Sequence, residues 1–313
     1  MKAIVAQAFG GPEVLELREV PVPVPGPGQV LVRLHAAGVN PVETYIRSGR
    51  YDPLPELPYT PGGDGAGVVE AVGAGLQGFA VGERVYVSGC PSYAEYALCP
   101  GGGVHPLPDG VSFAQGAAMG VPYATALRAL DIGGAQAGDL VLVHGGSGGV
   151  GTAAVQICRG LGMDVAATAS SEEGRRLLAG LGAVAVAHGA YAEAREAFGG
   201  RAFNIILEMA ADRNLGQDLA ELAQGGSIVV VGSRGPVQVN PRDLMRSGGA
   251  VRGVLLFQTP PQTLRRIHLR LVAALAAGWL KPVIGRSFPL AQAAQAHEAV
   301  LAPGALGKIV LEI

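Results

Sequence analysis

One short segment, Gly146-Ser147-Gly148-Gly149-Val150-Gly151, constrains the fold of this chain more than any other. Its glycines fit the spacing G-x-G-x-x-G, which carries little weight alone in a chain with 49 glycines. Here, however, an apolar run (140–143) precedes the segment, a helix-forming run (152–161) follows it, and another apolar run comes about thirty residues later. This context predicts a strand, a tight turn and a helix, in which bare backbone approaches a pyrophosphate at the positive helix end. The alternative is a tight turn that binds no ligand.

The chain before about residue 108 differs in pattern from the chain after it. Short β-rich runs at 30–35, 66–73 and 84–87 are separated by Gly and Pro, which is typical of a barrel-like, mostly antiparallel domain. The proline-rich stretch 20–28 cannot donate a full ladder of hydrogen bonds, so we expect it to run extended as an edge or connector.

From Ser112 onward, helical and apolar segments alternate. Helices are predicted over 115–130, 152–161 and 263–277, and a final strand over 308–311. Continuous apolar strands are expected at 140–143, 164–168, 184–187, 204–208, 227–231 and 253–257. This alternation predicts an α/β chain with a doubly wound parallel sheet. We therefore expect a β-barrel domain over 1–115, completed by 258–313, and a dinucleotide-binding domain over 116–257.

The end of the second strand of the parallel sheet indicates which dinucleotide is bound. An acidic residue there would accept a hydrogen bond from the ribose of NAD and repel a 2′-phosphate. This strand instead ends on Ser170-Ser171, and Arg175 and Arg176 follow within reach. The pattern favours NADPH. A shift of one residue in the strand end would let Glu172 serve NAD, and the arginines would then be a solvated helix face.

Composition excludes several classes of function. The net charge is −2 and there is no run of like charges, which argues against a nucleic-acid or membrane-surface binder. The longest apolar stretch, 271–280, is too short to span a bilayer, and the N-terminus reads as a first strand. The three cysteines, Cys90, Cys99 and Cys158, show no C-x-x-C pair and are interpreted as reduced, which predicts a cytoplasmic protein.

Further segments give the chain a family resemblance. Residues 39–49, 57–64, 93–97, 231–235, 240–243 and 279–285 resemble the zeta-crystallin-like NADPH:quinone oxidoreductases, a zinc-free branch of the medium-chain dehydrogenase/reductase superfamily. The resemblance covers essentially the whole chain. It implies a GroES-like catalytic domain, a Rossmann domain inserted between its two parts, and an active site in the cleft between them.

The resemblance also implies a set of cofactor contacts, to which Gly146, Ser170 and Arg175 are added from the arguments above. The implied contacts are Tyr45, Ser147, Gly148, Gly149, Val150, His188, Asn214, Val231, Gly232, Ser233, Arg234, Val254, Leu255 and Leu256. For His188 the alternative is an ordinary exposed loop histidine. Ser170 replaces a glycine of the family, so only its backbone is expected to contact the cofactor. Gly146 stands where an alanine is common, a change that should be harmless.

No metal is expected. The zinc-dependent alcohol dehydrogenases of the same superfamily use Cys and His ligands and a separate four-cysteine lobe. Here Val39 and Asn40 stand where the first cysteine would be, Gly63-Asp64 replaces the second ligand motif, and the lobe is missing. The six histidines show no ligand-like spacing, and Cys90 and Cys99 are expected to be small packing residues.

Without a Lewis acid, the substrate must accept reducing equivalents readily, as quinones and alkenes conjugated to a carbonyl do. Asn40 and Tyr45 are the polar side chains expected to face the nicotinamide and the substrate carbonyl. Tyr45 either donates a hydrogen bond to that carbonyl or only contacts the cofactor. Tyr51 and Tyr59 are weaker candidates for pocket walls.

Three functions stay open at this point. The first is an NADPH-dependent quinone reductase, and the second is an NADPH-dependent enone or 2-alkenal reductase. The third, suggested by relatives in the family, is an NADPH-binding protein with an RNA-binding or structural role, although the charge makes nucleic acid an unlikely partner. A homodimer is expected through the strand edge at 253–257, with a tetramer as the alternative.

Overall fold

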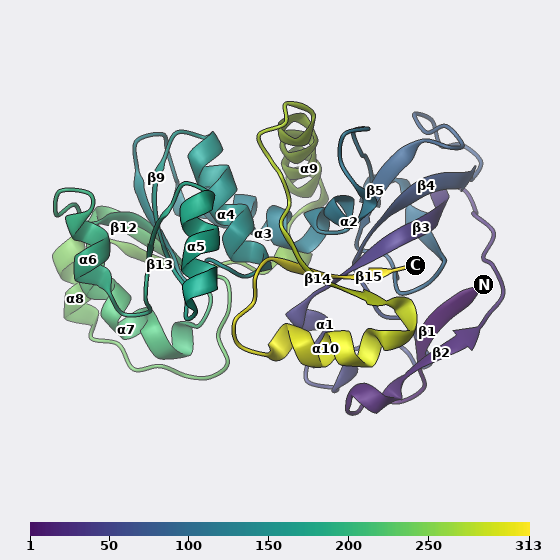
Figure 1. Cartoon of the computed structure of the whole chain (residues 1–313), viewed down its shortest axis with the longest axis horizontal. Coiled ribbons are helices and arrows are strands. Elements are labelled where there is room, and N and C mark those ends of the chain that lie inside the picture. Colours follow the sequence, from purple (N-terminus) through teal and green to yellow (C-terminus); the bar gives the residue numbers. More distant parts are fainter. The chain divides into compact units, whose positions relative to one another are not determined.

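The computed structural model describes residues 1–313 and divides them into two compact units. Unit 1 holds Met1–Val121 together with His268–Ile313, and unit 2 holds Pro122–Ile267. The C-terminal segment therefore joins the same unit as the N-terminal one, as Figure 1 shows by the yellow strand β15 beside the purple strand β3. The expected boundaries, after residues 115 and 257, lie slightly earlier in the chain.

Unit 2 is built on a parallel sheet of six strands in the order β10-β9-β8-β11-β12-β13. The strands are β8 (Leu140–Val143), β9 (Asp164–Thr168), β10 (Val184–Val186), β11 (Phe203–Glu208), β12 (Leu222–Val230) and β13 (Ala250–Gly253). From β8 the chain winds outward in one direction and then, from β11, in the other. The predicted doubly wound fold is confirmed, and its strand order reverses between β8 and β11, where ligands of such sheets bind.

Helices cover both faces of this sheet. They are α3 (Ala124–Gly133), α4 (Gly149–Gly160), α5 (Glu172–Gly180), α6 (Tyr191–Glu196), α7 (Ala211–Glu221) and α8 (Pro241–Ser247). On one face, Ile206 and Ile228 pack in a core with Leu219 of α7. The neighbouring strand residues Ile205 and Val229 point the opposite way and lie against Gly133 of α3. The strands are therefore buried on both sides, which explains why they read as continuous apolar runs.

Unit 1 contains a sheet of seven strands. They are β3 (Gln29–Val39), β4 (Asp64–Val72), β5 (Arg84–Ser88), β6 (Tyr96–Pro100), β7 (Val104–Pro106), β14 (Ile284–Pro289) and β15 (Lys308–Glu312). Strand β3 pairs with β4 along one edge. Along its other edge it pairs first with β6 and then, from Ala36, with β15. One long strand thus joins the N-terminal sheet to the end of the chain.

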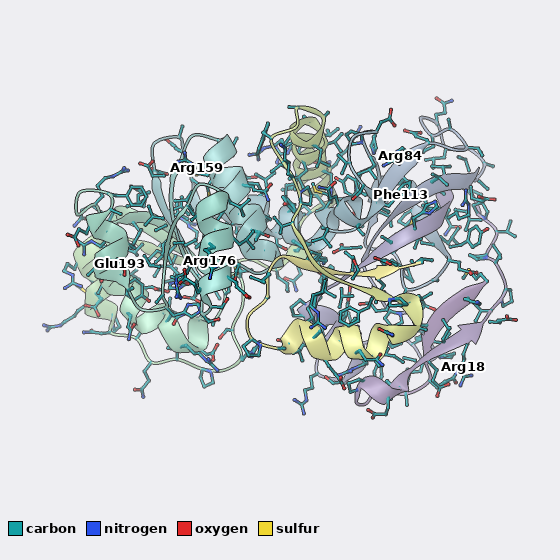
Figure 2. The ribbon with its side chains drawn as sticks, in the orientation of Figure 1. Arg18, Arg84, Phe113, Arg159, Arg176 and Glu193 are labelled. Atoms are coloured by element: carbon teal, nitrogen blue, oxygen red, sulfur yellow. A yellow bond between two sulfur atoms is a disulfide. The ribbon has the colours of Figure 1, made fainter.

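Smaller elements complete unit 1. A two-stranded sheet is formed by β1 (Lys2–Ala6) and β2 (Leu15–Glu19), and the helices are α1 (Pro41–Arg47), α2 (Phe113–Gly116) and α10 (Ala293–Leu301). Arg84 of β5 lies over the Phe113 ring of α2, with the guanidinium carbon 4.2 Å from the ring centroid (Figure 2). The proline-rich stretch 20–28 contains no strand, in agreement with the expected connector. Helix α9 (Pro261–Ala276) contributes to both units.

Two sequence-based expectations about secondary structure are wrong. The helix expected over 115–130 is divided into α2, a π-helical turn (Met119–Tyr123) that contains Pro122, and α3. Proline has no N–H for the helical ladder, which explains the break. The strand expected over 253–257 lies instead at β13, and Leu256–Gln258 form a short 3-10 turn. Leu255 and Phe257, which suggested a strand, are about half exposed rather than packed in the sheet.

The expectation of three reduced cysteines is also wrong for two of them. Cys90 and Cys99 form a disulfide, with Cα atoms 5.4 Å apart, and both side chains are buried. Cys158 is free, and burial raises the pKa of its thiol to about 12. The cysteines therefore no longer indicate a cytoplasmic location. None of the helices combines the length and the apolar run needed to cross a membrane.

Candidate functional site

The candidate cofactor site lies at the carboxyl edge of the parallel sheet in unit 2. All six strands run the same way, so their carboxyl ends meet at one edge. The expected contacts follow these ends in turn: residues 146–150 after β8, Ser170 and Arg175 after β9, His188 after β10, Asn214 after β11, 231–234 after β12 and 254–256 after β13. The fold thus brings together segments that are up to about a hundred residues apart, at the edge where such sheets bind ligands.

The glycine-rich loop has two kinds of glycine. A Cβ on Gly151 would lie 2.4 Å from the Gly145 carbonyl oxygen, so only glycine fits there. A Cβ on Gly148 would meet nothing closer than the Gly145 oxygen at 3.5 Å, so packing within the protein does not require a glycine there. Gly148 is the N-cap of α4, whose first N–H groups have no partner within the helix. This open, positive helix end fits a pyrophosphate.

Thr168 connects the glycine-rich loop to two neighbouring strands. Its carbonyl oxygen accepts from the N–H of Gly146 at 2.8 Å, and its hydroxyl accepts from the N–H of Gly145 at 3.2 Å. The same hydroxyl lies 2.9 Å from Nδ1 of His188. Burial, and secondarily the charge of His144, lower the pKa of His188. His188 is an exposed residue of the turn after β10, and the Thr168 hydroxyl holds its ring beside the loop.

The region after β9 holds the residues that distinguish the two dinucleotides. Arg175 donates to the Ala169 carbonyl at 3.3 Å and pairs with the Glu172 carboxylate at 2.8 Å. Arg176 pairs with the same carboxylate, but its side chain is 72% exposed. The hydrogen bond from Arg175 lowers the pKa of Glu172. Glu172 is thus already engaged by two guanidinium groups, and Arg175 is held over the end of β9, next to the exposed Ser170.

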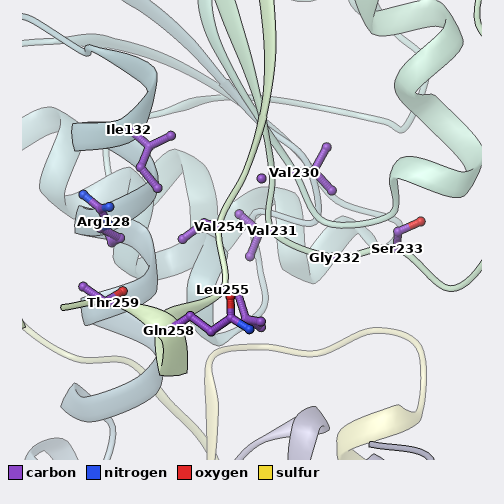
Figure 3. Close-up of a pocket in the computed structure, with 11 residues that line it drawn as sticks. Arg128, Ile132, Val230, Val231, Gly232, Ser233, Val254, Leu255, Gln258 and Thr259 are labelled. Carbon is purple, nitrogen blue, oxygen red and sulfur yellow. The ribbon is translucent and has the colours of Figure 1, made fainter. Parts of the chain in front are cut away.

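A pocket of about 420 Å³ opens where β12 and β13 end (Figure 3). Five expected contacts line it: Val231, Gly232, Ser233, Val254 and Leu255. Sequence reasoning did not anticipate Arg128 and Gln258, which also line it and which come from α3 and the turn after β13. Arg234 lies outside this pocket, and its N–H donates to Asp212.

Glu208, a residue that sequence reasoning missed, joins Asn214 to the end of β12. The Asn214 amide donates to Oε1 of Glu208 at 3.2 Å. The backbone oxygen of Glu208 accepts from the N–H groups of Val231 and Gly232 at 2.8 and 3.2 Å. Glu208 therefore holds two of the expected contact segments in place from beneath.

In unit 1, Asn40 is at the centre of a buried polar network. Its side-chain N–H groups donate to Glu43 at 3.1 Å and to Asp64 at 2.8 Å, and its oxygen accepts from the Lys308 ammonium. Lys308 also pairs with Asp64 at 3.0 Å. Asn40 is only 2% exposed, so its amide is fully used inside the protein. Its side chain therefore has no free polar atom to offer to a substrate.

The network continues from Glu43 to a histidine. The Tyr93 hydroxyl lies 2.6 Å from the Glu43 carboxylate and 3.1 Å from Nε2 of His297. Burial raises the pKa of Glu43 to about 7, although the Lys308 charge and the hydrogen bond from Tyr93 oppose this shift. Burial lowers the pKa of His297 to about 3. The group as a whole fixes α1, which carries Tyr45, against the sheet.

The three tyrosines named from sequence lie in different surroundings. Tyr45, on α1, is partly exposed. Tyr59 lines a mainly apolar pocket of about 370 Å³ in unit 1, together with Glu43 and Ile46. Its buried hydroxyl has no hydrogen-bond partner. Tyr51 does not line that pocket. Tyr59 therefore lines a cavity, and its place in the substrate pocket stays a prediction.

The positions of the superfamily's zinc ligands carry a different chemistry here. The oxygens of Asn40 and Asp64 that would face a metal are occupied by the Lys308 ammonium. Elsewhere, one trio of His, Cys, Asp or Glu side chains lies within 4.8 Å of one another, namely His144, Glu208 and Asp218 in unit 2. Because the Lys308 ammonium already lies between the side-chain oxygens of Asn40 and Asp64, these residues do not fit a catalytic zinc.

Comparison with known proteins is consistent with both units. Residues 26–109 match the family described as alcohol dehydrogenase GroES-like domain, and residues 149–274 match the family described as zinc-binding dehydrogenase. A quinone oxidoreductase of Homo sapiens is 47% identical over 99% of this chain and 97% of its own length.

Solved structures agree with this. A quinone oxidoreductase from Thermus thermophilus, solved alone and with NADPH, has a TM-score of 0.87 and 34% identity and is covered completely. A mycobacterial protein solved in complex with NADPH has a TM-score of 0.90 and 31% identity, again over both whole chains.

Proposed function

The chain belongs to the quinone oxidoreductase family of the medium-chain dehydrogenase/reductase superfamily, and we propose that it reduces quinones with NADPH and without a metal. The observation that carries this proposal is the open cradle at Gly148, where the backbone at the positive end of α4 is free to receive a pyrophosphate. When bound, NADPH supplies the reducing equivalents.

The residues of unit 2 hold the cofactor in this proposal. The loop 146–150 receives the pyrophosphate, and Arg175, with the backbone at Ser170, receives the 2′-phosphate. His188 and Asn214 contact the ribose side, and residues 231–234 and 254–256 receive the nicotinamide end at the pocket of Figure 3. Tyr45 is the remaining contact that the family resemblance implies. Support comes from the placement of the unit 2 segments on one sheet edge.

On the substrate side, the protein's task is to orient the acceptor. Tyr45 donates a hydrogen bond to the quinone oxygen, and Asn40 acts through Glu43 by fixing helix α1. Because Lys308 occupies the oxygens at the zinc positions, no Lewis acid polarises the substrate there. An acceptor that stabilises negative charge by its own conjugation, such as a quinone, fits this site.

The test is the oxidation of NADPH and, in parallel, of NADH by the purified full chain, with an ortho-quinone, a para-quinone and a 2-alkenal as acceptors. We expect rapid turnover of quinones with NADPH preferred. Activity with the alkenal alone would assign the enone reductase function instead. Tight NADPH binding without any turnover would favour a binding or structural role, and a gel shift with AU-rich RNA would then test the RNA-binding alternative.

Tyr45→Phe tests the hydroxyl separately, with Tyr51→Phe as the matched control. We expect kcat with quinones to fall about tenfold in the first variant, the size of a lost hydrogen bond to a developing charge, and to stay unchanged in the second. Unchanged turnover in Tyr45→Phe would leave Tyr45 with a packing role only.

We also propose that the chain forms homodimers and acts in the cytoplasm. β13 is an edge strand of the six-stranded sheet, and its residues Val251–Gly253 are exposed, so a second copy has a backbone edge to pair with. A monomer in light scattering would contradict this. The Cys90–Cys99 disulfide is the observation against the cytoplasmic location, which cell fractionation decides.

A further inference from the structure

Three ionisable side chains form a buried cluster in unit 2 that the proposed reaction does not use. His144 directly follows β8, Glu208 ends β11 and Asp218 lies on α7. Nε2 of His144 is 2.8 Å from Oδ1 of Asp218 and 3.5 Å from Oε2 of Glu208. The side chains are 3%, 0% and 0% exposed. Water therefore does not compensate their charges.

The hydrogen bonds within the cluster leave two oxygens without a donor. Oδ1 of Asp218 accepts from His144 and from the Tyr191 hydroxyl, and Oε1 of Glu208 accepts from backbone and amide N–H groups. Oδ2 of Asp218 and Oε2 of Glu208 are both buried and unpartnered. Two neighbouring buried carboxylates repel each other when both are ionised, so one proton held between the three groups relieves the repulsion and supplies the missing donor.

The shifts in pKa agree with this geometry. Burial, and secondarily the contact with Asp218, raise the pKa of Glu208 to about 7. Burial acts to lower the pKa of His144, but the hydrogen bond and charge of Asp218 outweigh it, so the pKa is raised. The groups that face the cluster from the packed elements are Tyr191 and Arg195 of α6, His188 after β10 and Glu221 of α7. Arg195 is paired with Glu221 at 3.2 Å, so neither supplies a free charge to the cluster.

The cluster lies directly beneath the candidate cofactor site. His144 is followed immediately by Gly145, which opens the glycine-rich loop. Oε1 of Glu208 holds Asn214, and the Glu208 backbone oxygen holds the N–H groups of Val231 and Gly232. Three of the expected contact segments are therefore attached to the cluster, the glycine-rich loop through the peptide chain and the other two through hydrogen bonds.

We propose that His144, Glu208 and Asp218 share one proton that couples NADPH affinity to pH, an inference that rests on the proposed cofactor. With the proton, the cluster carries one negative charge in all; without it, two. NADPH brings the negative charge of its phosphates to the loop that begins beside His144, so it binds better to the protonated cluster. NADPH binding is therefore accompanied by proton uptake near neutral pH. The affinity for NADPH falls as the pH rises through the value at which the cluster titrates in the NADPH-bound protein.

Calorimetric titration of the full chain with NADPH, in buffers of different ionisation enthalpy, tests this. In the wild type, we expect net proton uptake near pH 7 and a dissociation constant that rises about fivefold from about pH 6.5 to about pH 8.5. Glu208→Gln keeps an oxygen for Ala210 and Asn214 and places an N–H donor where the proton was. NADPH binding to this variant should therefore take up no protons, and its dissociation constant should stay the same from about pH 6.5 to about pH 8.5.

Glu196→Gln is the matched control, because Glu196 is an exposed carboxylate on α6 and has no side-chain partner. It should behave as the wild type, and any proton exchange by the 2′-phosphate itself is common to all three proteins. A Glu208→Gln variant with the wild-type pH profile and proton uptake would overturn the proposal. So would NADPH affinity that depends on added Zn²⁺ or is abolished by EDTA, because a metal would then occupy the cluster.

A second readout separates this inference from the proposed function. With ¹⁵N-labelled histidine, the ring signals of His144, assigned by their loss in His144→Gln, should titrate near neutral pH and shift by at least about half a pKa unit in Glu208→Gln. If the chain binds no NADPH at any pH, both the proposed function and the coupling of NADPH affinity to pH are overturned. The ring signals of His144 would still show whether the three side chains share a proton. Ring signals that do not respond to Glu208→Gln would overturn the sharing itself.

Discussion

His105 and His268 stack on each other inside unit 1, with ring centroids 3.9 Å apart and ring planes 11° from parallel. Both are buried, at 8% and 2% exposure, and their hydrogen bonds are to the hydroxyls of Tyr86 and Ser88 rather than to a carboxylate. Burial lowers the pKa of His105 to about 2 and that of His268 to about 4. The folded protein therefore keeps both rings neutral where the unfolded chain would protonate them.

This pair makes the protein less stable in acid. Above the ordinary histidine pKa of 6.5, neither state is protonated and stability is at its full value. As the pH falls from there towards 4, the unfolded chain takes up protons that the folded chain cannot, and each histidine costs about 1.4 kcal/mol per pH unit. In His105→Gln we expect a lower free energy of unfolding at neutral pH but a flatter decline in acid. Urea denaturation at several pH values measures the slope, which the exposed variant Glu193→Gln should leave unchanged.

Lys308 is expected to be a strong determinant of stability. Lys308→Met would leave the buried Asp64 carboxylate without its cation, which costs about 3–5 kcal/mol when one partner of a buried pair is removed. Arg18→Met removes an exposed partner of Glu16 and should cost less than about 1 kcal/mol. Chemical denaturation compares the two. Equal losses would mean that Asp64 is compensated by its hydrogen bonds from Asn40 and Val121 alone.

Much of the fold could be predicted because its signals are local. Apolar runs gave the bounds of β8 and β9, and the glycine spacing located the loop before α4. The buried network could not be predicted in this way, because Lys308 and Asp64 are 244 residues apart in sequence and nothing near either residue indicates the other. The sequence indicates only one part of this network. Asn40 and Glu43 lie three residues apart at a helix start that contains Pro41, which is the spacing of a capping box.

The residues of the candidate site also differ in how well local sequence predicts them. Glycine and arginine positions after β8 and β9 were readable, because their chemistry depends on neighbouring residues in the chain. His144, Glu208 and Asp218 come from three separate segments and meet only through the order of the strands and helix α7. The cysteines failed for a similar reason. The nine-residue spacing of Cys90 and Cys99 fits no metal or redox motif, and their proximity depends on the packing around β6.

The two kinds of glycine in the loop predict opposite behaviour. Gly151→Ala would force a Cβ within 2.4 Å of the Gly145 oxygen, so the loop must move and unit 2 should lose several kcal/mol of stability. Gly148→Ala meets only an ordinary contact, so we expect normal stability but NADPH affinity reduced by at least about tenfold, since the methyl group enters the phosphate cradle. Thermal unfolding and NADPH titration of both variants measure these effects.

Gly146→Ala gives a third outcome. Its Cβ would lie 2.9 Å from the Ala167 Cβ and 3.1 Å from the Leu178 side chain, so the loop has less room than the family resemblance suggested. We expect a loss of about 1–3 kcal/mol, typical of overpacking. A variant as stable as the wild type would show that Leu178 moves aside.

Arg175 is expected to set the preference for NADPH. Arg175→Ala removes the guanidinium held over the end of β9, so the dissociation constant of NADPH should rise about tenfold while that of NADH stays the same. Arg176→Ala is the control, because its side chain is 72% exposed and already turned to Glu172 (Figure 2 labels it on α5). If both variants keep the preference for NADPH, the 2′-phosphate is recognised elsewhere.

The pairing of β3 with β15 has a consequence for how the protein is made. Unit 2 is one continuous stretch of chain, so it is complete as soon as its last strand and helix leave the ribosome. One edge of β3 at Ala36–Val39 is paired with β4 early, but the other edge has no partner strand until β15 emerges, and Asp64 has no ammonium until then. Strand β3, made early in synthesis, thus belongs to a sheet that only β15 completes, and the whole of unit 2 is synthesised between the two segments of unit 1.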